Sequence, residues 1–129
     1  MSGLLLDTTV LIDLSRGYIQ AATFIDEKHQ AQTLLLISAI SAMELIYGCR
    51  DNAEVKQASL LVADFTVLHL SPVDSVKAYE LMLTFSKSHN LAIPDALIAA
   101  TALNQGLELA TDNVRHFKMI PALNVFKPY

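Results

Sequence analysis

The strongest constraint on the fold is a regular alternation of short apolar runs with longer helical segments. The first run, Gly3-Leu4-Leu5-Leu6, is continuously apolar, as expected of a central strand buried on both faces. Strand-like runs follow at 33–37, 65–70, 107–110 and 123–126, and helical patterns occupy 8–14, 18–30, 41–48, 52–64, 72–88 and 95–106. The alternation predicts an α/β fold, a three-layer sandwich with a mainly parallel central sheet of about four or five strands and helices on both faces.

Local capping signals predict where several of these helices begin and end. Ser71 and Pro72 form a helix start, with serine as the cap and proline in the first position. Gly48 and Gly106 are plausible helix ends. Ser41 and Glu44 have the spacing of a capping box, so the alternative to a functional role for Glu44 is that its carboxylate only ties back to the backbone N–H of Ser41.

The length and composition fit a single domain covering residues 1–129. Apolar residues make up 53% of the chain and the mean hydropathy is +0.39, so one substantial core is expected, with apolar surface left to cover a subunit interface. No apolar run reaches the roughly 18 residues that a membrane span needs, and no basic stretch precedes the first run. The single Cys49 excludes an internal disulfide, so we expect a cytoplasmic protein without a membrane partner.

Asp95 stands at the head of an almost wholly apolar helix. The segment Ile93-Pro94-Asp95 opens it, and leucine, isoleucine and alanine cover most of its faces downstream. A carboxylate at the rim of a buried helix needs a hydrogen-bond donor, a cation or a metal ion. The alternative is that Asp95 only complements the positive end of the helix dipole.

Three further acids are expected to join Asp95 at one edge of the sheet. Asp7 follows the first strand, Asp112 follows the strand at 107–110, and Glu44 lies within about two helical turns of the second strand's end. Ligand sites of parallel sheets lie beyond the carboxyl ends of the strands, and this places the acids together.

Four neighbouring carboxylates favour a hard divalent cation. The acids would repel one another, and Mg²⁺ or Mn²⁺ takes oxygen ligands of this kind. Zinc is disfavoured because the histidines are scattered (His29, His69, His89 and His116), and the four glycines are too far apart for a phosphate-binding loop. The net charge of −4 argues against a broad basic surface but leaves room for a local one.

Four motifs together resemble the PIN-domain ribonucleases, most closely the VapC-type toxins of toxin–antitoxin pairs. The motifs are Leu-Leu-Leu-Asp7-Thr-Thr, Ser-Ala-Met-Glu44-Leu-Ile-Tyr-Gly, Ile-Pro-Asp95-Ala-Leu-Ile and Leu-Ala-Thr111-Asp112-Asn113. Asp7, Glu44 and Asp95 match the family's metal-site acids. In the fourth motif the family places its acid at the position of Asn113, whereas this chain has Asp112 one residue earlier.

Two other positions also depart from the family pattern. Thr9 replaces an asparagine that is common in the first motif, and His116 stands where relatives often have an acid. Either Asp112 therefore serves as the fourth acid after a local shift, or the site has a weaker fourth ligand.

The resemblance implies a Mg²⁺-dependent endoribonuclease toxin (Mn²⁺ is the alternative ion), forming a homodimer and neutralised by a cognate antitoxin protein. Asp7 and Asp95 would bind the metal, while Glu44 and Asp112 would hold its waters or orient the nucleophile. Residues expected to assist at the site or to guide the RNA are Thr111, Asn113, Arg16, Arg50, Arg115 and Lys118. The helices at 18–30 and 52–64 would form the groove for the antitoxin.

Two alternatives remain open on the residues alone. One is a catalytically weak or inactive PIN-like domain, suggested by Asn113 and His116. The other is a Mg²⁺-binding, receiver-like module that acts by protein binding, although no lysine follows a strand as such a module would need.

Overall fold

The computed structural model describes residues 3–129 and has a five-stranded sheet in which all neighbouring strands are parallel. The strand order is β3-β2-β1-β4-β5, so β1 lies at the centre. The strands are β1 (Gly3–Leu6), β2 (Leu34–Ser38), β3 (Thr66–Leu68), β4 (Glu108–Ala110) and β5 (Val125–Phe126). The predicted parallel α/β sandwich is confirmed.

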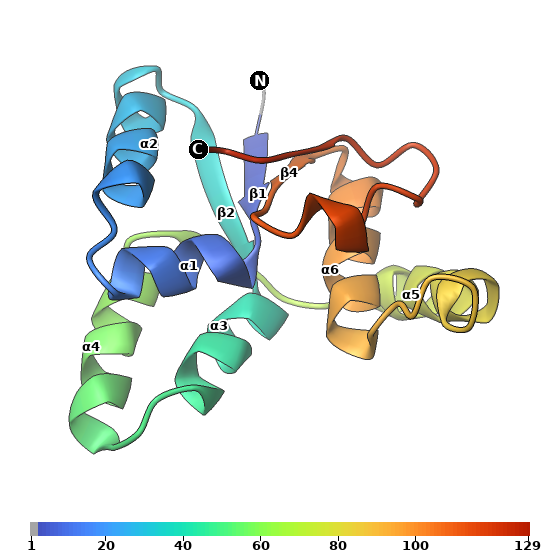
Figure 1. The fold of residues 1–129 in the computed structure, drawn as a ribbon, viewed down its shortest axis with the longest axis horizontal. Helices are drawn as coiled ribbons and strands as arrows, with labels where there is room; N and C mark the ends of the chain where they lie inside the picture. Colours follow the sequence, from blue (N-terminus) through green and yellow to red (C-terminus); the bar gives the residue numbers. More distant parts are fainter. Residues whose placement is uncertain (1–2) are drawn as a thin grey trace.

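Six helices connect the strands, and they cover both faces of the sheet (Figure 1). They are α1 (Thr8–Ser15), α2 (Ile19–Gln30), α3 (Ala39–Tyr47), α4 (Asn52–Val62), α5 (Pro72–Phe85) and α6 (Ile93–Gln105), with a 3₁₀ turn, η1, at Val114–His116. Helices α1 to α4 lie on one side of the strands and α5 and α6 on the other. Within residues 3–129, no helix is long and apolar enough to cross a bilayer.

The alternation of side chains along β1 explains the two cores. Leu5 faces a cluster formed largely by α5, α6 and the segment after η1 (Phe117 and Ile120), and Leu4 and Leu6 face a cluster formed by α1, α2, α3 and α4. All three leucines are buried. Successive strand residues point to opposite faces, so a continuously apolar strand supplies both layers.

The helix ends agree with the capping signals in part. Ser71 and Asp74 form a reciprocal capping box at the start of α5, and Gly106 ends α6 in the left-handed conformation, with φ 65°. The alternative capping box of Ser41 and Glu44 does not form. The cap of α3 is Ser38, whose Oγ accepts a hydrogen bond from the backbone N–H of Ile40, and Ser41 therefore lies inside the helix.

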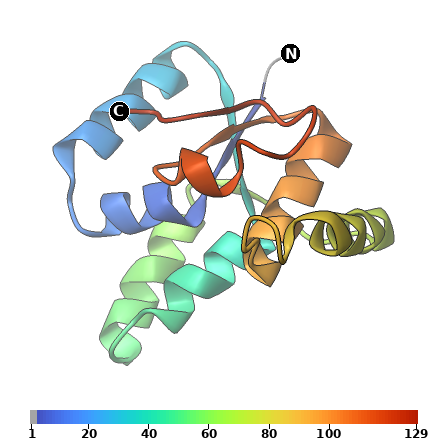
Figure 2. The same cartoon turned by 45° about the vertical axis from the view of Figure 1, so that its right-hand side comes forward.

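The C-terminal segment packs against the first part of the chain (Figure 2). β5 pairs with β4, and the rings of Phe126 and Tyr129 lie 6.3 Å and 6.1 Å from the ring of Phe24 on α2. The hydroxyl of Tyr129 donates a hydrogen bond to Asp13 Oδ2 at 2.6 Å. The end of the chain thus fixes α1, whose other end carries the first acid of the candidate site.

Candidate active site

Asp7 lies between β1 and α1, at the carboxyl edge of the central strand. Its backbone N–H donates to the carbonyl of Ala110 on β4, and the residue is buried, with 3% of its surface exposed. Oδ2 accepts hydrogen bonds from Thr111 Oγ1 at 2.7 Å and from Thr9 Oγ1 at 3.2 Å. These bonds fix the carboxylate and, within residues 3–129, leave Oδ1 available to a ligand.

Glu44 comes from α3 and is held by α1. Its Oε1 accepts a hydrogen bond of 2.6 Å from Thr8 Oγ1, the hydroxyl directly after Asp7 in the sequence. Its carboxylate is therefore not tied to the backbone of Ser41, and the side chain is half-buried at the same edge of the sheet. Glu44 is positioned by a side chain of the first motif.

Asp95 is the third residue of α6, and its environment opposes ionisation. Burial is the largest cause that raises its pKa, to about 6, and the negative charges of Asp7 and Glu44 raise it further. His116 acts in the opposite direction, with Nδ1 at 3.7 Å from Asp95 Oδ2. The three predicted acids therefore lie within electrostatic reach of one another.

No Lys or Arg within residues 3–129 lies within 4 Å of these three carboxylates. As the side chains stand, no three His, Cys, Asp or Glu residues in this part of the chain are close enough to one another to hold a metal ion. The three acids are thus in electrostatic contact but not at ligand distances from a common point. Because no Lys or Arg of residues 3–129 neutralises these acids, the cluster is suited to binding a hard cation.

Asp112 is not part of this cluster. Its carboxylate is 3.1 Å from Lys127 Nζ, its side chain is 50% exposed, and its charge acts on Tyr129. Its backbone N–H donates to Thr9 Oγ1 at 3.0 Å, which ties the loop after β4 to the first motif. Asp112, the predicted fourth acid, thus lies in a loop that contacts the first motif, but its carboxylate points to the C-terminal segment.

The other residues of the fourth motif act through hydrogen bonds. Thr111, which is fully buried, accepts a hydrogen bond from the backbone N–H of Asn113 at 2.9 Å while donating to Asp7. Asn113 therefore shapes the loop through its backbone. The hydroxyls of Thr8, Thr9 and Ser41 were not predicted as parts of the site, although two threonines directly after a strand-end acid were a visible signal.

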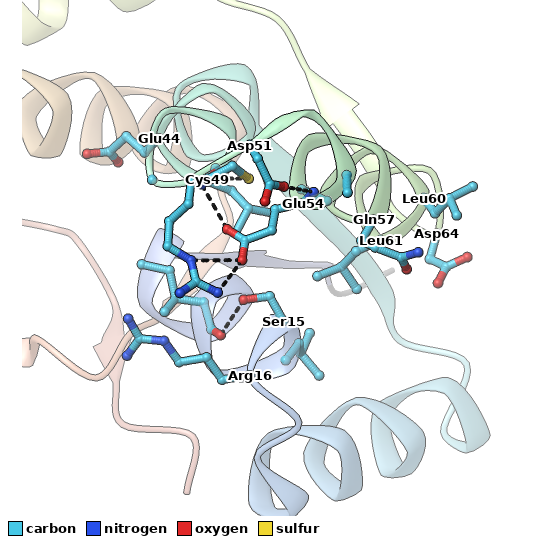
Figure 3. Close-up of a pocket in the computed structure, with 17 residues that line it drawn as sticks. Ser15, Arg16, Glu44, Cys49, Asp51, Glu54, Gln57, Leu60, Leu61 and Asp64 are labelled. Atoms are coloured by element: carbon cyan, nitrogen blue, oxygen red, sulfur yellow. Dashed lines mark hydrogen bonds and ion pairs between the residues drawn. The ribbon is translucent and has the colours of Figure 1, made fainter.

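A cavity of about 1040 Å³ between α1, α3 and α4 extends from Glu44 (Figure 3). Glu44 lies at one end and Asp64 at the other, and Arg16 lies on the α1 side. Arg50 forms an ion pair with Glu54, in which Nη2 and Nε lie 2.6 Å and 3.0 Å from Oε2. The charged lining consists of two arginines against four acids, namely Arg16, Arg50, Glu44, Asp51, Glu54 and Asp64.

The lining of this cavity comes from α1, α3 and α4 and the loops beside them. The antitoxin groove expected between the helices at 18–30 and 52–64 is a different surface and stays a prediction. The acidic lining of the cavity suits a basic segment of a protein better than a phosphate backbone.

The fold and the three acids define an α/β protein with an acidic site at the carboxyl edge of its parallel sheet. A family model described as "PIN domain" matches residues 4–122. The chain belongs to the PIN-domain family, and its relatives there are VapC proteins.

Three relatives illustrate the similarity. Ribonuclease VapC10 of Mycobacterium tuberculosis is 39% identical over 121 residues, covering 93% of this chain and 90% of the relative. A solved toxin–antitoxin complex from Klebsiella pneumoniae contains a chain with 30% identity, a TM-score of 0.77 and 98% coverage of both chains. VapBC2 from Rickettsia felis bound to a promoter DNA fragment has the same fold, with a TM-score of 0.82, 21% identity and coverage of 96% and 97%.

Proposed function

We propose that this chain is an endoribonuclease toxin that depends on Mg²⁺ or Mn²⁺ and is neutralised by a cognate antitoxin. The observation that carries the proposal is the placement of Asp7 at the end of β1, Glu44 against Thr8 and Asp95 at the start of α6, where the charges of Asp7 and Glu44 raise the pKa of Asp95. Three carboxylates that repel one another, with no Lys or Arg of residues 3–129 within 4 Å, are a donor set suited to a hard cation. The 39% identical relative is named a ribonuclease, and the 30% identical structure is a toxin–antitoxin complex.

The candidate ligands are Asp7 and Asp95, with Glu44 beside them. A bound divalent ion would supply an activated water and stabilise charge on the phosphodiester. Thr111 and Thr9 hold one oxygen of Asp7 and so present the other to the site. Asp95, with a pKa of about 6, is mostly ionised at neutral pH and offers its carboxylate there.

The remaining roles concern RNA and the antitoxin. Arg16, which lines the same cavity as Glu44, would contact an RNA phosphate, because Arg50 is already paired with Glu54. The antitoxin would insert a segment with apolar and basic side chains into the cavity between α1, α3 and α4. We also expect the whole chain to act as a single domain in the cytoplasm, as a homodimer.

RNA cleavage by the purified protein tests the proposal. We expect cleavage with MgCl₂ or MnCl₂ and none with EDTA, and a loss of at least about 100-fold for Asp7→Asn and Asp95→Asn. Asp64→Asn, an exposed acid at the far end of the cavity, is the matched control and should cleave like the wild type.

Asp112→Asn separates a three-acid site from a four-acid site. Because the Asp112 carboxylate lies with Lys127, we expect this variant to keep most of the activity. Activity that survives both Asp7→Asn and Asp95→Asn, or survives EDTA, would contradict the metal-carboxylate mechanism.

A further inference from the structure

The buried hydroxyl groups of Thr8 and Ser41 lie next to Glu44 and have no part in the chemistry described so far. Thr8 Oγ1 lies 3.0 Å from Ser41 Oγ and 2.6 Å from Glu44 Oε1. Thr8 is 8% exposed and Ser41 is fully buried. The three side chains form a line of hydrogen bonds from the interior of α3, through the first residue of α1, to the carboxylate at the site.

The direction of the protons along this line follows from the chemistry of its end. An ionised carboxylate can only accept, so the single hydrogen of Thr8 points to Glu44. Ser41 Oγ, at 3.0 Å, is the second hydrogen-bond partner of the Thr8 hydroxyl. Each hydroxyl is thereby satisfied, in agreement with the absence of unpaired buried side-chain polar atoms in residues 3–129.

We propose that Thr8 and Ser41 are a positioning pair for Glu44. The Thr8 hydroxyl fixes Oε1, Ser41 fixes the Thr8 hydroxyl, and Oε2 has no hydrogen bond from residues 3–129 and remains for the site. Asp7 is held in the same way, because Thr111 and Thr9 both donate to its Oδ2 and Oδ1 remains for the site. The proposal rests on the proposed function in that Glu44 serves a metal-binding site.

A purely structural role is the competing explanation, because the same bonds join α1 to α3. A buried threonine that only joins two helices could be replaced by valine, which has a similar shape, with little consequence for the site. A positioning role instead predicts that the hydroxyl itself matters, and that it matters only while Glu44 is present.

Mn²⁺ binding, measured by titration calorimetry on the whole protein, distinguishes the two roles. Loss of a group that orients a metal ligand weakens metal binding by about tenfold or more, so we expect about tenfold weaker binding for Thr8→Val. Thr8→Ser keeps the hydroxyl and should bind close to the wild type, and Ser41→Ala should weaken binding by about threefold. Thr101→Val is the matched control, because Thr101 is equally buried in α6 and donates only to the carbonyl of Leu97.

A double-mutant cycle with Glu44→Gln tests whether the effect passes through Glu44. In that background Thr8→Val should change Mn²⁺ affinity no further. Thr8→Val binding Mn²⁺ like the wild type, or losing the same factor without Glu44, would overturn the proposal. If Thr8→Val does not fold, as judged by its circular dichroism melt, the comparison of Thr8→Ser with Ser41→Ala carries the same test.

RNA cleavage measured in parallel keeps the two proposals apart. A wild type that binds Mn²⁺ with this pattern of variants but cuts no RNA would refute the ribonuclease activity and support the positioning pair. If the wild type cuts RNA and Thr8→Val has the same metal affinity and the same cleavage rate, the ribonuclease activity is supported and the positioning pair is refuted.

Discussion

Asp95 should destabilise the metal-free protein at neutral pH, and replacing it should make the protein more stable. Its pKa rises from 3.8 to about 6 on folding, so the folded state binds this proton more tightly than the unfolded state. The contribution to stability is therefore greatest below about pH 4 and is lost as the pH rises from about 4 to about 6. The Asp95→Asn variant cannot ionise and avoids this loss.

The magnitude follows from the size of the shift. A change from 3.8 to about 6 corresponds to about 3 kcal/mol. Because the side chain keeps 23% of its surface exposed, solvent screens part of this, and we expect about 2 kcal/mol. For a chain of this size, that free energy raises the melting temperature of Asp95→Asn by about 6–10 °C.

The assay is thermal and urea unfolding in EDTA at several pH values between 5 and 7.5. Asp95→Asn should be more stable than the wild type at pH 7.5, and its advantage should shrink to roughly half at pH 5. Added Mg²⁺ should stabilise the wild type and close the gap, because a ligand of the folded state raises its stability. Asp112→Asn, which loses only a half-exposed pair with Lys127, is the control and should change stability by less than about 1 kcal/mol.

An Asp95→Asn variant that is no more stable than the wild type at pH 7.5, or whose advantage is the same at every pH, would refute the reasoning. Either result would mean that the neighbouring acids and burial do not oppose ionisation of Asp95.

Three further substitutions test the packing around the site, each by urea unfolding. Tyr129→Phe removes the hydroxyl that donates to Asp13 at 2.6 Å and should cost about 1–2 kcal/mol; an unchanged midpoint would show that the C-terminal contact contributes nothing. Asn104→Ala removes the amide that donates a 2.7 Å hydrogen bond to the carboxylate of Asp74, a residue that is only 2% exposed, and should cost about 1–3 kcal/mol. An unchanged stability would mean that water replaces the amide freely. Gly106→Ala places a side chain at φ 65° in open space and should cost about 1 kcal/mol from the backbone alone; a neutral result would contradict the left-handed end of α6.

The fold could be predicted because its signals are local. Leu4, Leu5 and Leu6 are apolar without interruption, and Asp7 stops the run, so both the burial of the strand and its end can be read from neighbouring residues. The helix starts were less certain wherever two residues could serve as caps. Ser38 and Ser41 both precede apolar helical residues, and only the structure shows that Ser38 is the cap.

The hydrogen bonds of the candidate site could not be predicted in the same way, because they join distant parts of the chain. Thr8 reaches Ser41 and Glu44 across 33 and 36 residues, and sequence spacing carries no information about side-chain direction at such separations. Asp112 shows the same limit. Its neighbour Lys127 arrives through the pairing of β4 with β5, and this pairing decides where the carboxylate points.

Asp7 receives its hydroxyl partner, Thr111, from 104 residues further along the chain. The strand before Asp7 also lies between β2 and β4, so β1 lacks one of its two neighbours until β4, much later in the sequence, has been made. A nascent chain that has not yet released β4 from the ribosome therefore lacks the assembled acidic pocket. If the proposed function holds, a polypeptide cut short before Thr111 would lack the hydroxyl that fixes Asp7 and would not cleave RNA.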